Sequence, residues 1–262
     1  MDIQKTLWTV FSVSMQLQKH LVNKYQNEVE RFVFCGLEKT NKISLAFLSL
    51  YPQINDNEEI EFSLGILARS VLMDMILVLE IKNTHKEYQH ETTDILRQKL
   101  KNCCLKLIND GTKYFVEEIY SSQNLSDEEK KSKSKMFTSI FPNAFNESPD
   151  KPKLKKEYEF NLTKIGKDAK DTDPIFSNAI FNLYSYYSKY DHLSHWTSLS
   201  SHFPFEEKKG KLDLSIILMK QHLKDLIQIM IDYDDNYKDL QSYVNDLDIL
   251  FSETSEVKNQ KK

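Results

Sequence analysis

The sequence predicts an all-α protein, a bundle of about six main helices with a long C-terminal helix. Three observations support this fold class. Apolar residues recur with the 3.6-residue period of amphipathic helices along most of the chain. Only 5 glycines and 6 prolines occur in 262 residues, which leaves few tight turns. No segment of useful length alternates apolar and polar residues as a strand would. We therefore expect helices in over half of the residues and no sheet beyond two short strands.

Composition is that of an ordinary globular protein, with 40% hydrophobic and 28% charged residues. The length suits one domain with a real core. We expect a single helical domain over residues 1–252 and a disordered tail over residues 253–262. The net charge of −4 gives no overall attraction to nucleic acid.

The cysteines indicate a cytoplasmic protein. Cys35, Cys103 and Cys104 are odd in number and lack the C-x-x-C spacing, which is typical of thiols in a reducing compartment. The first twenty residues lack the basic segment and clean apolar stretch of a signal peptide. We expect neither secretion nor a disulfide framework.

The most apolar run, residues 60–81, predicts a buried core helix rather than a membrane span. A span would have to place four charges in hydrocarbon, on Glu61, Arg69, Asp74 and Glu80. No membrane partner is therefore expected.

In the N-terminal part, the apolar period predicts a helix over residues 3–34 that stops at Gly36. A second helix is expected over residues 37–50, where Tyr51 and Pro52 end it.

Two longer helices follow in the prediction. Residues 58–83 are hydrophobic nearly all round, as in the central helix of a bundle. A polar link, NTHKEYQHETT, separates them from a helix over residues 91–121 with an apolar stripe.

Residues 122–173 differ from the rest of the chain. They are rich in lysine and acidic residues and contain three of the six prolines. We expect a mobile insertion with one or two short helices. A helix is then expected from Pro174, with Asp173 as its N-cap, to about Trp196.

The C-terminal segment carries the clearest pattern, a stripe of apolar residues at alternating spacings of four and three. Its members are Leu212, Ile216, Met219, Leu223, Leu226, Met230, Tyr233, Tyr237, Leu240, Val244, Leu247 and Phe251. Such a seam suits another helix, so we predict a homodimer through it. The chain's own N-terminal helix is the alternative partner. The polar cluster at residues 234–236 is a candidate break.

The segment from Tyr184 to Trp196 is the densest collection of functional groups. On a helix, Ser188 and His192 lie one turn apart, and Asp191 and His195 share a neighbouring face. A hydroxyl beside an imidazole is suited to general acid–base chemistry near neutral pH. Alternatively, His192 bonds a carbonyl at a helix end and the tyrosines are core residues.

A metal site is the weaker interpretation of the same segment. His192, His195 and His202, with Asp191, supply ligand types, but their spacing matches no metal motif. No phosphate-binding, dinucleotide-binding or zinc-protease motif occurs elsewhere. We predict no metal and no cofactor.

Two charges lie on the apolar helix of residues 58–83. Arg69 and Asp74 are five residues apart, about 140° around the helix, so each needs a partner from another helix. The structural interpretation is an ion pair that fixes helix register. The functional interpretation places Arg69 in a cleft that faces Ser188 and His192.

These segments resemble a known family. ARSVLMDMILVLEI resembles an Arg-Ser-x-x-acid helix, and YSYYSKYDHLS resembles the Tyr-x-x-x-Ser-x-x-x-His-x-Ser signature of bacterial domain-of-unknown-function family 5677. More loosely, the layout is similar to the HEPN superfamily of helical bundles, which includes toxins and phage-defence ribonucleases. The resemblance implies a helical fold, RNA as substrate, and the site residues Arg69, Asp74, Tyr184, Ser188, His192 and Ser194.

Two functions are therefore expected. The first is a bacterial helical protein that acts through protein contacts and self-association. The second is a HEPN-like ribonuclease or toxin in phage defence, with Arg69, Ser188 and His192 as catalytic residues. Its binding residues would be Asp74, Tyr184, Asp191, Ser194 and His195.

Overall fold

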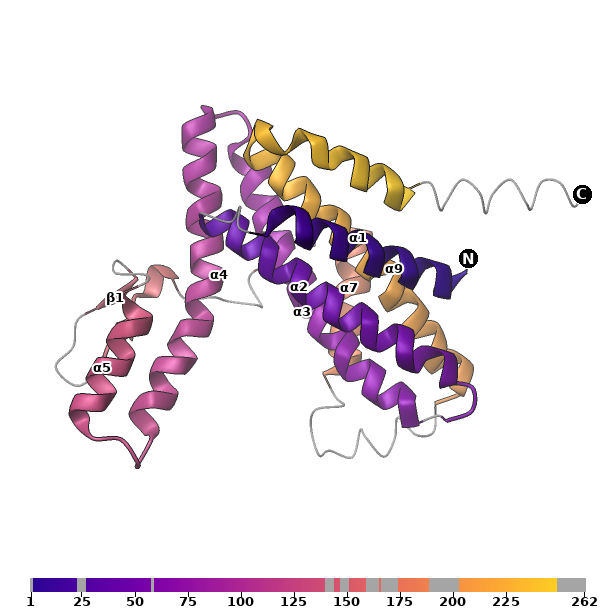
Figure 1. Cartoon of the computed structure of the whole chain (residues 1–262), viewed down its shortest axis with the longest axis horizontal. Coiled ribbons are helices and arrows are strands. Elements are labelled where there is room, and N and C mark those ends of the chain that lie inside the picture. Colours follow the sequence, from indigo (N-terminus) through magenta and orange to yellow (C-terminus); the bar gives the residue numbers. More distant parts are fainter. Residues whose placement is uncertain are drawn as a thin grey trace, which may run out of the picture.

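The computed structural model describes residues 2–22, 27–57, 59–139, 144–146, 151–158, 165, 174–188 and 203–248. These residues form an all-α bundle, as predicted (Figure 1). Its six longest helices are α1 (Ile3–Leu21), α2 (Glu28–Leu50), α3 (Glu59–Tyr88), α4 (Thr93–Ser121), α7 (Pro174–Tyr187) and α9 (Phe205–Tyr233).

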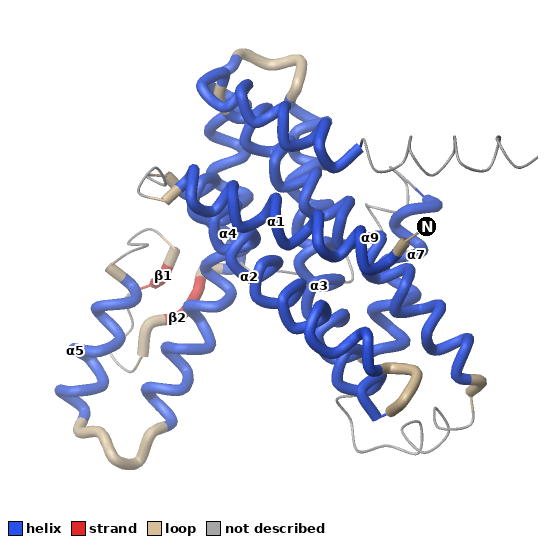
Figure 2. The backbone as a smooth tube through the Cα atoms, turned by 45° about the vertical axis from the view of Figure 1, so that its right-hand side comes forward, coloured by secondary structure: helices blue, strands red, loops and turns tan. Residues whose placement is uncertain are grey.

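Shorter elements complete the described chain (Figure 2). Helix α5 (Asp127–Thr138) follows α4, and strands β1 (Phe145–Asn146) and β2 (Lys153–Leu154) form one antiparallel pair. The short 3-10 helices are η1 (Tyr51–Gln53), η2 (Lys156–Tyr158) and η3 (Asp235–Leu240). Among the described residues, the sheet is limited to these two short strands, which agrees with the prediction.

Helix α3 is the centre of the bundle, since it packs against α2, α4, α7 and α9. Its fully or nearly fully buried residues include Leu64, Leu72, Met75, Ile76 and Ile81. By length and by a mean hydropathy of 1.9, α3 alone among the described helices could cross a membrane. Half of that apolar window is buried inside the protein. Cys103 and Cys104 of α4 are buried as small core residues, whereas Cys35 is exposed.

The predicted helix over residues 3–34 is wrong, because two helices share its apolar stripe. Helix α1 ends at Leu21, and Asn27 begins α2 with a capping box. The Asn27 side chain accepts from the backbone N–H groups of Val29 and Glu30, and the Glu30 carboxylate accepts from the Asn27 N–H. Both helices turn their apolar face to the same core, so the period continues across the break.

The expectation that Gly36 stops a helix is also wrong, because Gly36 lies inside α2. A Cβ at this position would lie 3.0 Å and 3.1 Å from the two methyl carbons of Leu226 on α9. Leu226 is fully buried. The missing side chain therefore allows α2 and α9 to approach closely, although glycine in a helix costs about 1 kcal/mol relative to alanine.

A pair of Gly-to-Ala variants tests this close approach. Gly210→Ala, on the exposed side of α9 with nothing within 4 Å of its Cβ, is expected to stabilise the protein by up to about 1 kcal/mol. Gly36→Ala gains the same helix propensity but crowds Leu226, so it is expected to be at least about 1 kcal/mol less stable than Gly210→Ala. Urea unfolding of both variants measures the difference. Equal stability of the two would show that Leu226 moves aside freely.

The polar link predicted after residue 83 is also wrong, because α3 continues to Tyr88 and only residues 89–92 connect it to α4. No glycine or proline interrupts the segment. Two of its polar side chains, His85 and Lys86, line a pocket between α3, α4 and α9 rather than the apolar core.

The C-terminal stripe is buried within the chain. Its members on α9 are at most 6% exposed, and the helix packs against α1, α2 and α3. The stripe therefore has the intramolecular partner that was the alternative to a dimer seam, and a second copy could reach it only if the bundle opened. Phe251 and the tail of residues 253–262 lie outside the described residues.

The stripe is not one continuous helix, because α9 ends at the polar cluster. Asp234 is extended, and its side chain accepts from the Asn236 N–H to begin η3. Residues 241–248 are helical again. The Tyr237 hydroxyl donates to Glu30 of α2 at 2.7 Å, which ties this segment to the bundle.

Helix α4 leaves the bundle in its C-terminal part and pairs there with α5 (Figure 1). We call the described residues between 105 and 158 the arm. The arm has a hydrophobic cluster of its own, formed by Val116, Ala144, Phe145 and Leu154. This cluster is far smaller than the core of the bundle. All its members but Val116 lie in the region predicted as a loosely packed insertion, residues 122–173, whose described part contains the short helices α5 and η2.

The arm is expected to open more readily than the bundle. Four buried apolar side chains supply little free energy against the conformational entropy of ordering this region. Amide hydrogen exchange should therefore be fastest, among the described helices, in α5, and slowest in α3 and α9. Slower exchange in α5 than in α1 would contradict this expectation.

Candidate functional site

The structure brings two of the predicted site residues together. The Arg69 guanidinium carbon on α3 lies 5.6 Å from the ring centroid of Tyr184 on α7, close enough for a cation–π contact. Both residues are partly buried. The first resembling segment and the described part of the second, residues 184–188, therefore lie side by side, since α3 and α7 pack against each other.

The proposed Ser188–His192 pair is only half described. Ser188 follows the last residue of α7, where its hydroxyl donates to the Ser185 carbonyl at 2.9 Å. Its backbone N–H donates to the Tyr184 carbonyl at 2.8 Å, so Ser188 continues the helical pattern. The other predicted residues of this segment lie outside the described residues: Asp191, His192, Ser194, His195 and His202.

Asp74 has the cross-helix partner that the structural interpretation requires. Its Oδ1 lies 2.8 Å from Nζ of Lys39 on α2, and Lys39 also donates to the Ser70 carbonyl at 3.3 Å. Burial raises the pKa of Asp74 above its usual value, although the Lys39 ammonium acts in the opposite direction. This ion pair links α2 to α3, which is the cross-helix contact that the structural interpretation of Asp74 expects.

His222 lies near the same ion pair and was missed from the sequence. This α9 residue is buried, and neither ring nitrogen has a hydrogen-bond partner among the described residues. Burial and, to a lesser degree, the charge of Lys39 lower the pKa of His222 to about 3. A neutral imidazole at the packed face of α9 is a core residue, and only its position beside Leu223 in the stripe hinted at burial.

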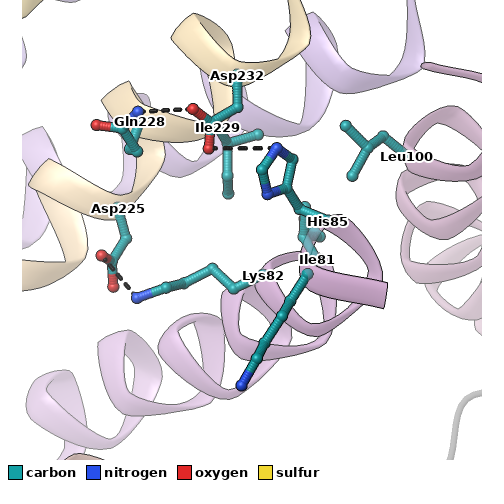
Figure 3. Close-up of a pocket in the computed structure, with 9 residues that line it drawn as sticks. Ile81, Lys82, His85, Leu100, Asp225, Gln228, Ile229 and Asp232 are labelled. Atoms are coloured by element: carbon teal, nitrogen blue, oxygen red, sulfur yellow. Dashed lines mark hydrogen bonds and ion pairs between the residues drawn. The ribbon is translucent and has the colours of Figure 1, made fainter. Parts of the chain in front are cut away.

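The main pocket of interest lies between α3, α4 and α9 (Figure 3). Its volume is about 220 Å³. Residues of all three helices line it: Ile81, Lys82, His85, Lys86, Leu100, Asp225, Gln228, Ile229 and Asp232. Apolar side chains from each helix form the floor, and charged side chains of α3 and α9 face one another across the opening (Figure 3).

Two charge contacts cross this pocket. Lys82 Nζ lies 3.1 Å from Oδ1 of Asp225, which also accepts from the Gln221 amide at 3.0 Å. His85 Nε2 lies 3.8 Å from Oδ2 of Asp232, a looser contact that is an ion pair only when the imidazole is protonated. The pocket therefore presents both signs of charge above an apolar floor.

Sequence reasoning missed this pocket because its two sides lie far apart in the chain, with Lys82 and Asp225 separated by 143 residues. The spacing was nevertheless informative: Lys82, His85 and Lys86 recur at the three- and four-residue intervals of one helix face. Asp225 and Asp232, seven residues apart, share a face of α9. Among the described residues, no group of three or more His, Cys, Asp or Glu side chains is arranged to hold a metal ion.

The fold and these contacts define the class of protein as an all-α helical bundle with a projecting arm and a charged pocket. Comparisons with protein-family models, with curated proteins and with solved structures found no match. The resemblance to family 5677 and to the HEPN superfamily therefore stays a hypothesis that depends on the residues alone.

Proposed function

We propose that the protein acts in the cytoplasm through protein contacts, and that it self-associates through the arm. The observation that supports this most is the combination of exposed apolar side chains and a self-complementary charge pattern on the arm. The buried C-terminal stripe is occupied within the chain, so the contact surface has to be elsewhere.

The arm exposes large apolar side chains to solvent. Tyr114 on α4 is 64% exposed and Met136 on α5 is 63% exposed. Tyr114 is seven residues before the end of α4 and Met136 nine residues after the start of α5, so they stand about 10 Å and 14 Å from the connecting turn. Apolar side chains at similar heights on a projecting element are suited to a partner surface.

Helix α5 is acidic in its first turn and basic over the two turns that follow. Asp127, Glu128 and Glu129 occupy its first turn, and Lys131, Lys133 and Lys135 follow, all exposed. Two copies related by a two-fold axis with antiparallel α5 helices would place the acidic first turn of each against the basic turns of the other. The same surface on both copies would then be complementary to itself.

A charge-reversal pair tests the proposal. Asp127→Lys/Glu128→Lys and Lys131→Glu/Lys135→Glu are each expected to weaken the dimer, because like charges would then face one another. An equimolar mixture of the two variants should recover a heterodimer. Sedimentation equilibrium at a series of concentrations measures the masses.

The matched control is Lys42→Glu, an exposed lysine on α2 whose reversal should leave the dimer unchanged. A wild-type protein that remains a monomer throughout the concentration range would contradict self-association. Variants that dimerise like wild type would contradict the arm as its surface.

A HEPN-like ribonuclease or toxin is the second candidate. The contact between Arg69 and Tyr184 favours it, because it joins the first resembling segment to the start of the second. Arginine is suited to stabilise phosphate charge during RNA cleavage, and a histidine to transfer protons. Arg69, Ser188 and His192 remain its proposed catalytic residues.

Nuclease assays on labelled single-stranded RNA, with growth after induced expression, test this candidate. Arg69→Gln and His192→Ala should both abolish cleavage and toxicity. Arg31→Gln, the exposed arginine of α2, is the control and should retain both. Cleavage that survives both variants would reject the proposed site, and absence of cleavage by wild type would reject the function.

A further inference from the structure

We propose that the pocket between α3, α4 and α9 binds a small zwitterion with an apolar body, the chemistry of a free α-amino acid with an apolar side chain. This is a ligand site, and it does not depend on self-association through the arm. Three features of the pocket support the inference. They are its apolar floor, the arrangement of its charges, and the remaining hydrogen-bonding capacity of Asp232 and Lys86.

The floor of the pocket is apolar. Ile81 of α3, Leu100 of α4 and Ile229 of α9 line it, and the side chains of Leu100 and Ile229 lie on the two sides of His85 (Figure 3). The volume of about 220 Å³ exceeds the cavity of roughly 150 Å³ that accommodates benzene in a protein core. A branched aliphatic or single-ring side chain therefore fits.

The charges at the opening are of both signs. Lys82, His85 and Lys86 lie on one face of α3, opposite Asp225 and Asp232 of α9. A simple anion would meet both carboxylates, and a simple cation would meet both lysines. A zwitterion can instead place each of its charges against the opposite one, which is the arrangement that the pocket favours.

The bonding pattern indicates where each charge of the ligand would go. Asp225 is 8% exposed and already accepts from Lys82 and Gln221. Asp232 is 29% exposed, accepts from Gln228 at 2.7 Å, and lies beyond hydrogen-bond distance of His85. Asp232 thus retains capacity for a ligand ammonium group.

Lys86 supplies the opposite charge. It is exposed at the pocket, and none of the described acidic residues lies within ion-pair distance of it. A ligand carboxylate beside Lys86, with its ammonium group at Asp232, would place the apolar side chain over Ile81 and Ile229. The contacts of Lys82 and His85 with α9 hold α3 and α9 together both with and without the ligand.

Isothermal titration calorimetry of the full chain tests the site with defined probes. L-leucine and L-phenylalanine are expected to bind saturably. Glycine, which lacks the apolar body, should bind at least about tenfold more weakly. The same loss is expected for 4-methylpentanoate and for 3-methylbutylamine, which each lack one charge.

Two pocket variants complete the test. Lys86→Gln and Asp232→Asn should each weaken leucine or phenylalanine binding about tenfold or more, while Lys42→Gln, on an exposed face of α2, should leave it unchanged. Lys86 is exposed, so its variant should fold like wild type, which circular dichroism checks. The proposal is overturned if neither amino acid binds, if one of the singly charged analogues binds as tightly, or if both pocket variants bind like wild type.

Discussion

Lowering the pH from 7 to 4 is expected to reduce the free energy of unfolding by about 3 kcal/mol through His222 alone. Burial lowers the pKa of His222 to about 3 in the folded protein, whereas an unfolded histidine has the ordinary value of 6.5. Between these two values the unfolded chain binds the proton and the folded chain does not. The contribution of the neutral His222 to the free energy of unfolding is therefore fully present above pH 6.5, and it is lost as the pH falls toward 3.

His222→Met isolates this effect. Neither imidazole nitrogen has a hydrogen-bond partner among the described residues, so an apolar side chain of similar size should cost little at pH 7. Urea unfolding at pH 7, 5.5 and 4 should show that the variant retains about 3 kcal/mol of the stability that wild type loses. The comparison between proteins removes the contribution of carboxylates, which both share.

The control for this prediction is His90→Met, which replaces an exposed histidine between α3 and α4. Its pH dependence should follow that of wild type. If His222→Met also loses stability as wild type does, the imidazole is protonated in the folded state and the core tolerates its charge.

Lys39→Met is expected to destabilise the protein by about 2 kcal/mol at pH 7, because it leaves the Asp74 carboxylate, which is only 18% exposed, without its cation. Burial already raises the pKa of Asp74 with Lys39 present, so loss of the lysine should raise it further. The double variant Lys39→Met/Asp74→Leu removes both charges and should recover most of the loss. Chemical unfolding of the three variants measures the coupling.

Lys42→Met is the matched control, since Lys42 is only three residues along α2 and its ion pair with Glu38 is largely exposed. Its cost should stay below about 0.5 kcal/mol. Lys39→Met should also raise the pKa of His222, because the ammonium charge contributes to the low value. A Lys39→Met protein as stable as Lys42→Met would show that Asp74 reaches solvent or another partner.

The sequence by itself determined the fold class and most of the core. The 3.6-residue period marks the face of each helix that turns inward, and scarce glycine and proline leave no room for a sheet-rich fold. This is why the stripe on α9 and the all-round apolar character of α3 correctly indicated burial. The sequence also indicated that Asp74 needs a partner on another helix. Asp74 and Arg69 are five residues apart on one helix, so they point in different directions and cannot pair with each other.

Tertiary structure alone decided what each buried face packs against. Periodicity specifies an inward face but carries no information on the partner, so a helix of the same chain and a second copy give the same pattern. The apolar period runs on through the capping box at Asn27, so it did not reveal that a new helix begins there. The absence of a side chain at Gly36 is explained by Leu226 of another helix and not by the neighbours of Gly36 in the sequence. The pocket is the clearest case: Lys82 and Asp225 are ordinary surface charges in sequence, and only the packing of α3 on α9 brings them within 3.1 Å.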